Sequence, residues 1–221
     1  MNSKDERQML DILDAFDKRG FKGAIIFDVP STQFVRVNLM MLRGLSQERG
    51  LPGVFISVDR PHQYMVHLLS MHQIKAENLI FIDAISNFSA DFKVANANVG
   101  FMEGPFRIDR LPMAMSEWTK GCNGQSLNLS NRGFAIIDNL SALLTYNSFN
   151  SVQTFLQNFI QALHASGSMI VPLMIDSEKS GLLYETAKSL CNMEVRMKDI
   201  LSDHLLDAEV KKTEEINCAK G

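Results

Sequence analysis

The 221-residue chain has few cysteines, no excess of basic residues and no long apolar run. Its three cysteines (Cys122, Cys191 and Cys218) form no C-x-x-C pair, which argues against a disulfide framework and a structural zinc site. Lys and Arg (22) do not outnumber Asp and Glu (25), so the basic surface that binds nucleic acid is missing. No apolar run is long enough to cross a bilayer, and the N-terminus has no signal-peptide pattern. We expect no nucleic-acid partner, no membrane contact and a cytoplasmic location.

The overall composition of the chain is that of an ordinary globular protein, with 46% hydrophobic and 21% charged residues. At this length we expect one domain over residues 1–221. Ser3 and Glu6 form a capping box that predicts an N-terminal helix within residues 1–20. Apolar residues at helical spacing after residue 198 predict a C-terminal helix and tail over residues 199–221.

Short continuous apolar runs recur along the chain and predict strands that are buried on both faces. These runs cover residues 23–28, 53–58, 79–82, 134–137 and 169–175. An irregular excursion over residues 84–130 carries one more expected short strand at 99–102. Pro172 lies inside the last run, and a proline there favours an edge strand or a bulge.

Helical patterns alternate with these strands, at residues 33–49, 61–72, 113–120 and 150–166. Strand followed by helix, repeated, favours right-handed crossovers and a mostly parallel sheet. The expected fold is therefore a three-layer α/β/α arrangement with helices on both faces of the sheet.

Acidic residues follow each of the main predicted strands: Asp28, Asp59, Asp83, Asp138 and Asp176. The carboxyl ends of parallel strands meet at one edge of the sheet, where ligands bind in such folds. Clustered carboxylates there could hold Mg²⁺ and, through it, a nucleotide phosphate. The alternative is that each aspartate caps the helix that follows its strand.

One stretch carries a resemblance to a known family. Residues 133–147, Gly-Phe-Ala-Ile-Ile-Asp-Asn-Leu-Ser-Ala-Leu-Leu-Thr-Tyr-Asn, resemble the Walker B strand and following helix of RecA-fold ATPases of the KaiC-like group. Residues 53–61 and 79–86 are similar to that group's second and third strands, and the resemblance covers most of residues 20–198 in order. It implies a RecA-like fold that binds ATP and Mg²⁺, with Asp138 as the Walker B acid and Asp59 at the position of a catalytic carboxylate.

The chain departs from that family after its first strand, where the resemblance implies a phosphate loop, G-x-x-x-x-G-K-[ST]. Residues 28–36 contain neither glycine nor lysine, and no Gly-Lys dipeptide occurs anywhere in the chain. Pro30 also lacks a backbone N–H. Ser31 and Thr32 could cap the next helix and offer hydroxyls to an anion at its N-terminus. We expect Arg36 on the solvated face of that helix and His62 at the surface.

Three functional hypotheses remain open at this point. The first is a non-catalytic RecA-fold binding or regulatory module that needs no cofactor and acts through a protein partner or a homo-oligomer. The second is an ATP-binding sensor or weak ATPase whose non-standard site uses Ser31, Thr32, Asp59 and Asp138, with Asp138 holding Mg²⁺. The third is a receiver-like α/β domain, although such domains place a lysine after a late strand, where Asp176 and Ser177 stand here.

Overall fold

The computed structural model describes residues 3–18, 20–86, 98–119, 131–166 and 169–197. Within them, seven parallel strands form one sheet in the order β4-β3-β2-β5-β6-β1-β7. The strands are β1 Gly23–Asp28, β2 Gly53–Ser57, β3 Leu79–Asp83, β4 Val99–Phe101, β5 Phe134–Ile137, β6 Ile170–Ile175 and β7 Met193–Arg196.

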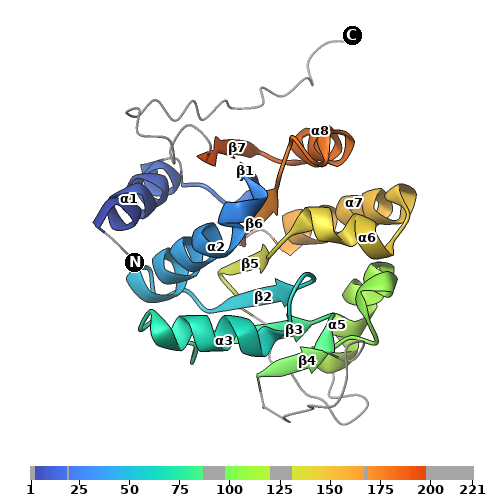
Figure 1. Cartoon of the computed structure of the whole chain (residues 1–221), viewed down its shortest axis with the longest axis horizontal. Helices are drawn as coiled ribbons and strands as arrows, with labels where there is room; N and C mark the ends of the chain where they lie inside the picture. Colours follow the sequence, from blue (N-terminus) through green and yellow to red (C-terminus); the bar gives the residue numbers. More distant parts are fainter. Residues whose placement is uncertain (1–2, 19, 87–97, 120–130, 167–168, 198–221) are drawn as a thin grey trace.

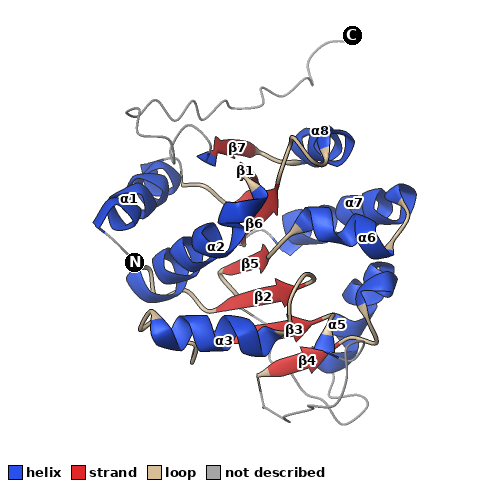
Figure 2. Ribbon diagram, viewed as in Figure 1, coloured by secondary structure: helices blue, strands red, loops and turns tan. Residues whose placement is uncertain are grey.

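Helices cover both faces of this sheet, as Figure 2 shows. In Figure 1, helices α1 to α3 lie on one face, and helices α5 to α8 lie on the other. The α-helices are α1 Ser3–Lys18, α2 Phe34–Leu42, α3 His62–Met71, α5 Leu111–Thr119, α6 Leu143–Tyr146, α7 Phe149–Ser166 and α8 Gly181–Leu190. The short helical turns are η1 Ser31–Gln33, η2 Arg43–Glu48, η3 Pro105–Arg110 and η5 Leu140–Ala142. The predicted α/β/α architecture with a parallel sheet is confirmed.

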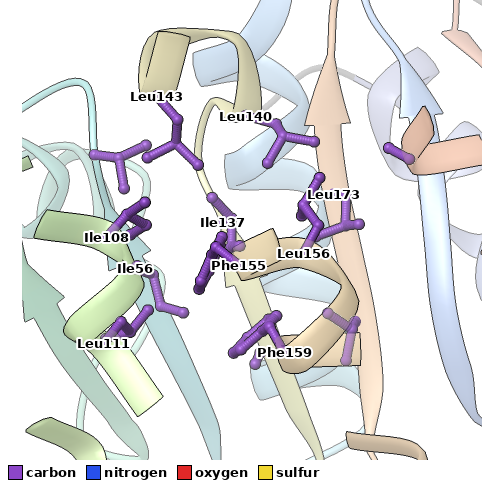
Figure 3. Packing of buried hydrophobic residues seen from close by; sticks show 14 of the residues in the cluster. Ile56, Ile108, Leu111, Ile137, Leu140, Leu143, Phe155, Leu156, Phe159 and Leu173 are labelled. Carbon is purple, nitrogen blue, oxygen red and sulfur yellow. The ribbon is translucent and has the colours of Figure 1, made fainter. Parts of the chain in front are cut away.

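Side chains that alternate along each strand divide the core into two clusters, one for each face of the sheet. On β1, Ile25 and Phe27 pack in the cluster that contains α1, α2 and α3. Ala24 and Ile26 belong to the opposite cluster, beneath α7 and α8. Figure 3 shows part of this second cluster, in which Phe155 of α7 lies over the sheet. Because both faces are apolar, the strands are continuous hydrophobic runs in the sequence.

Five of the expected strands, and the short strand near residues 99–102, are confirmed, but the expectation for Pro172 is wrong. Its strand, β6, lies inside the sheet between β5 and β1, and its register with β5 is unbroken by a bulge. The N–H of Ile170 donates to the carbonyl oxygen of Gly133 beside β5, at 2.9 Å. Two residues further on, Pro172 faces the same strand, so the missing N–H removes one bond of this ladder only.

The helical predictions are confirmed with one change. The pattern over residues 33–49 folds as α2 and then changes at Arg43 into the π-helical turn η2. The elements that the sequence patterns did not predict include α8 and β7. The expected C-terminal helix lies outside the described residues. None of the helices in the described parts of the chain is both long and apolar enough to pass through a bilayer.

The order of the strands creates a switch point between β2 and β5. These two strands are neighbours, but the chain continues from β2 to β3 on one side and from β5 to β6 on the other. The connecting helices α3 and α7 therefore lie on opposite faces, as Figure 1 shows. The crevice that opens where the crossovers diverge is the usual ligand position in open parallel sheets.

Candidate functional site

A narrow cleft, partly open to solvent, lies at this switch point. Asp59 follows β2 and Asp138 follows β5, and both line it. The structure thus brings together two of the four residues predicted for a nucleotide site. The remaining lining is mostly apolar or aromatic and consists of Phe34, Val35, Asn38, Phe55, Ser57, Arg60, Pro61, Tyr64 and Met65.

Asp138 forms the inner wall of the cleft and is only 6% exposed. Its Oδ1 accepts a hydrogen bond from the N–H of Val58 at 2.9 Å, and its carbonyl oxygen accepts one from Asn38 Nδ2 at 2.9 Å. Burial raises the pKa of Asp138 to about 7, against the opposing effect of the Val58 N–H, and the nearby charge of Asp59 raises it further. The carboxyl group is therefore partly protonated at neutral pH.

The mouth of the cleft is formed by Asp59, Arg60 and Tyr64. Arg60 Nε lies 3.7 Å from Asp59 Oδ2, and both side chains are more than one third exposed. The guanidinium carbon of Arg60 lies 5.0 Å from the ring centre of Tyr64, which is within cation–π range. The mouth thus already holds one cation between a carboxylate and an aromatic face.

Ser31 lies in a different environment and is not among the residues that line the cleft. Only Val29 and Pro30 separate β1 from the helical turn η1. The N–H of Ser31 donates to Asp176 Oδ2 at 2.8 Å, and Lys179 Nζ donates to Ser31 Oγ. An anion at this helix start would have to displace the Asp176 carboxylate.

The expected capping role of Ser31 and Thr32 is wrong. Ser31 is the first residue of η1, Thr32 is exposed, and no side chain caps either η1 or α2. Arg36 is partly exposed, with 32% of its side chain accessible, and its Nε donates to Asp5 Oδ1 of α1 at 3.0 Å. This ion pair fastens the N-terminal helix to α2.

Two of the acidic strand ends, Asp28 and Asp138, bind a loop of a neighbouring strand and do not cap the next helix, whereas Asp83 and Asp176 also accept N–H groups two or three residues further along the chain. Asp28 accepts hydrogen bonds from Ser177, whose N–H lies 3.1 Å from Oδ1. After β5 the cap comes from Asn139, whose Oδ1 accepts the Ala142 N–H at 3.2 Å, and Asp138 takes no part in it. For these two strand ends the capping alternative is wrong, since the carboxylates instead tie one loop to another.

Asp83 is fully buried and binds the start of α3. Its Oδ2 accepts hydrogen bonds from the N–H of His62 at 2.8 Å and from His62 Nδ1 at 2.6 Å. The surface position expected for His62 is wrong, because this residue is 4% exposed. Burial alone would raise the pKa of Asp83, but hydrogen bonds from His62 and Ser86 hold it at about 2. Because the ionised carboxylate can only accept, His62 Nδ1 carries the proton.

The described residues around Asp138 do not provide a full set of side-chain ligands for Mg²⁺. Within the described ranges, no three His, Cys, Asp or Glu side chains gather closely enough to bind one metal ion. Asp138 has a raised pKa and already accepts the Val58 N–H, so it is a weak ligand for a hard cation. The loop after β1 has a proline where a phosphate loop offers an N–H.

Sequence reasoning missed Asn38, Asp176 and Lys179 as site residues. Asn38 is the one polar residue in the apolar run of residues 37–42, and that isolation was an available signal. Asp176 was predicted only as one of several acidic strand ends. Lys179 gave no signal, because it meets Ser31 across 148 positions of sequence, through the pairing of β6 with β1.

Comparison with known proteins places the fold. No family model matches the sequence, and no curated protein matches it significantly. Among solved structures, the chain is similar to the KaiC-like protein PH0186 of Pyrococcus horikoshii, with 11% identity, a TM-score of 0.52, and coverage of 79% of this chain and 71% of that one. It is also similar to protein PH0321 of the same archaeon, solved with an unknown peptide, with 13% identity, a TM-score of 0.58, and coverage of 83% and 82%. The chain therefore has the RecA-like α/β fold that the sequence resemblance implied.

Proposed function

We propose that the chain is a non-catalytic RecA-fold module that acts through protein contacts. The observation on which this depends most is the hydrogen bond from the Ser31 N–H to the Asp176 carboxylate. In a phosphate-binding loop, backbone N–H groups at this helix start face the anion. Here the Ser31 N–H donates to the internal Asp176 carboxylate, and Pro30 has no backbone N–H to offer.

The lysine near this loop does not restore a phosphate site. Lys179 is the basic side chain at Ser31, but it approaches with Asp176 from the same β6–α8 connection. The positive charge of the lysine is thus accompanied by a carboxylate, and a phosphate would meet both. Without the glycine loop, the chain also lacks the flexible backbone that wraps a β-phosphate.

An exposed apolar stripe on α3 supports the protein-contact part of the proposal. Tyr64 and Met71 are 41% and 64% exposed, and Leu68 between them is half-buried. The spacing i, i+4, i+7 places the three on one side of the helix, which begins at the mouth of the cleft. Exposed apolar residues grouped in this way mark interaction surfaces. The peptide complex of PH0321 gives a precedent for peptide contact on this fold.

One observation supports the competing function, which is an ATP sensor that uses Asp59 and Asp138. These two carboxylates share a cleft at the switch point of the sheet. Under that hypothesis, Lys179 would be the cation that meets the phosphates. Replacing Lys179 would therefore impair an ATP sensor, whereas it would not change the function of a non-catalytic module.

Two exposed substitutions separate these functions. We expect the chain to self-associate as protein concentration rises from micromolar to millimolar, and light scattering to show the loss of this association in Met71→Glu. Met71 is exposed, so the charge should disturb the contact and not the fold. Lys179→Ala serves as the control, and its association should equal that of the wild type. A monomer at every concentration, or association that is lost in Lys179→Ala, would contradict the proposal.

A further inference from the structure

The exposed stripe on α3 has a fourth member, His67. This residue follows Tyr64 by three positions and precedes Met71 by four, so it lies on the same side of the helix, where it is exposed. With Leu68, the four residues have the i, i+3, i+4, i+7 spacing of a helix face that another element covers. The opposite side of α3, with Met65, already packs against the sheet, and Figure 1 shows α3 in an outer layer. The stripe is therefore a second packing face, which the described residues leave exposed.

The charges around the stripe indicate what kind of surface it fits. None of the ten residues from His62 to Met71 is Asp, Glu, Lys or Arg. Exposed charges lie beyond both ends of the helix, and each end has one acid and one base: Asp59 and Arg60 before α3, and Lys75 and Glu77 after it. Because these charges cancel at each end, the face does not attract a partner of either sign. A matching surface is itself apolar and uncharged at its centre.

The α3 helix of a second copy of the chain is such a surface. In an antiparallel pair, with a two-fold axis through the middle of the stripe, Tyr64 of each copy would meet the partner's Met71. A thioether sulfur against an aromatic ring is a favourable contact. A parallel pair would instead place Asp59 and Arg60 beside the same residues of the other copy, where like charges repel. The antiparallel pair avoids this repulsion and buries no charged residue of α3.

We propose that α3 is the contact between two copies of this chain, in an antiparallel pair with His67 beside the two-fold axis. This inference rests on the proposed function and names the partner of its protein contact. The stripe from Tyr64 to Met71 is about 10 Å long. A contact of this length buries less than the ~1,600 Å² of a standard stable interface. The dimer is therefore weak, which fits association between micromolar and millimolar concentration.

Charged substitutions at His67 test this arrangement, because a residue beside a two-fold axis faces its own copy. His67→Glu and His67→Lys should each weaken the association of the full chain by about tenfold in sedimentation velocity, since each brings two like charges together. An equimolar mixture of the two variants should form mixed dimers with at least the wild-type affinity, because it pairs opposite charges. His67 is exposed, so both variants should fold, and circular dichroism checks this.

The matched control is Gln157→Lys, which adds the same charge as His67→Lys at an exposed position of α7, on the other face of the sheet. Its association should equal that of the wild type. Undiminished association of either His67 variant, a mixture that stays monomeric, or a loss in Gln157→Lys would overturn the antiparallel pair, while the proposed function would keep its protein contact. A wild type that is monomeric at every concentration would instead contradict the proposed function, and this inference with it.

Discussion

Asp83→Asn is expected to lower the free energy of unfolding by about 3–5 kcal/mol, the range for breaking a buried charged network. Oδ2 of Asp83 accepts from His62 and from Ser86 Oγ, while Oδ1 accepts from the N–H groups of Ile85 and Ser86 at 2.8 Å. In either orientation, the amide NH₂ of the variant would face donors. The midpoint of urea unfolding measures the loss. Asp109→Asn, which removes an exposed partner of Arg107, is the control and should cost less than about 1 kcal/mol.

The depressed pKa of Asp83 adds a pH dependence to this result. The pKa of about 2 in the folded chain is below the ordinary value of 3.8. The unfolded chain therefore binds the proton first, and the stabilisation is complete above about pH 4 and disappears as the pH falls towards 2. At pH 2 the wild type and Asp83→Asn should thus differ far less than at pH 7. An equal difference at both pH values would contradict the assignment of Asp83 as an ionised anchor.

The second large effect has the opposite sign and concerns Asp138. Its pKa of about 7 in the folded chain is above the ordinary 3.8, so the folded chain keeps a proton that the unfolded chain releases. Stability therefore decreases as the pH rises from about 4 to 7 and is constant above that range. The shift corresponds to roughly 4 kcal/mol of lost stability at pH 8.

Asp138→Asn should remove this loss, because an amide stays neutral and its oxygen can still accept the Val58 N–H. The difference in unfolding free energy between variant and wild type, measured in urea at a series of pH values, should grow in favour of the variant by about 4 kcal/mol from pH 4 to pH 8. Asp14→Asn, on the exposed side of α1, should give a flat difference. A flat difference for Asp138→Asn would show that this carboxyl group titrates normally.

Much of the fold could be predicted from the sequence because the sheet is buried on both faces. The β1, β2 and β5 strands are continuous apolar runs that lead into acidic residues, a pattern typical of strands covered by helices on both sides. β7 lacks the pattern, since Glu194 lies in its middle. That carboxylate is buried but compensated by Lys188 Nζ at 3.1 Å, by Arg196 Nε at 2.8 Å and by the hydroxyl of Tyr184. Two of these partners, Tyr184 and Lys188, lie on α8, so the pattern of the strand alone cannot show that the charge is neutralised.

The site was predictable only in part, for a related reason. The positions of Asp59 and Asp138 at strand ends follow from the sequence, but their sharing of one cleft depends on β2 and β5 being neighbours. The same holds for Asp176, which reaches Ser31 because β6 lies beside β1. His62 was expected at the surface because its partner Asp83 lies 21 positions away. Each of these contacts depends on which strands are neighbours in the sheet, and the local sequence patterns do not show that order.

We propose, as the central point, that the helical turn η1 after β1 does not bind a nucleotide phosphate. Isothermal titration of the purified chain with ATP and with ADP, each with and without Mg²⁺, tests it most directly. With the Asp176 carboxylate on the Ser31 N–H, no heat of binding is expected even at millimolar nucleotide. Saturable binding in the micromolar range that requires Mg²⁺ would contradict the account and would make Asp59 and Asp138 residues of a working nucleotide site.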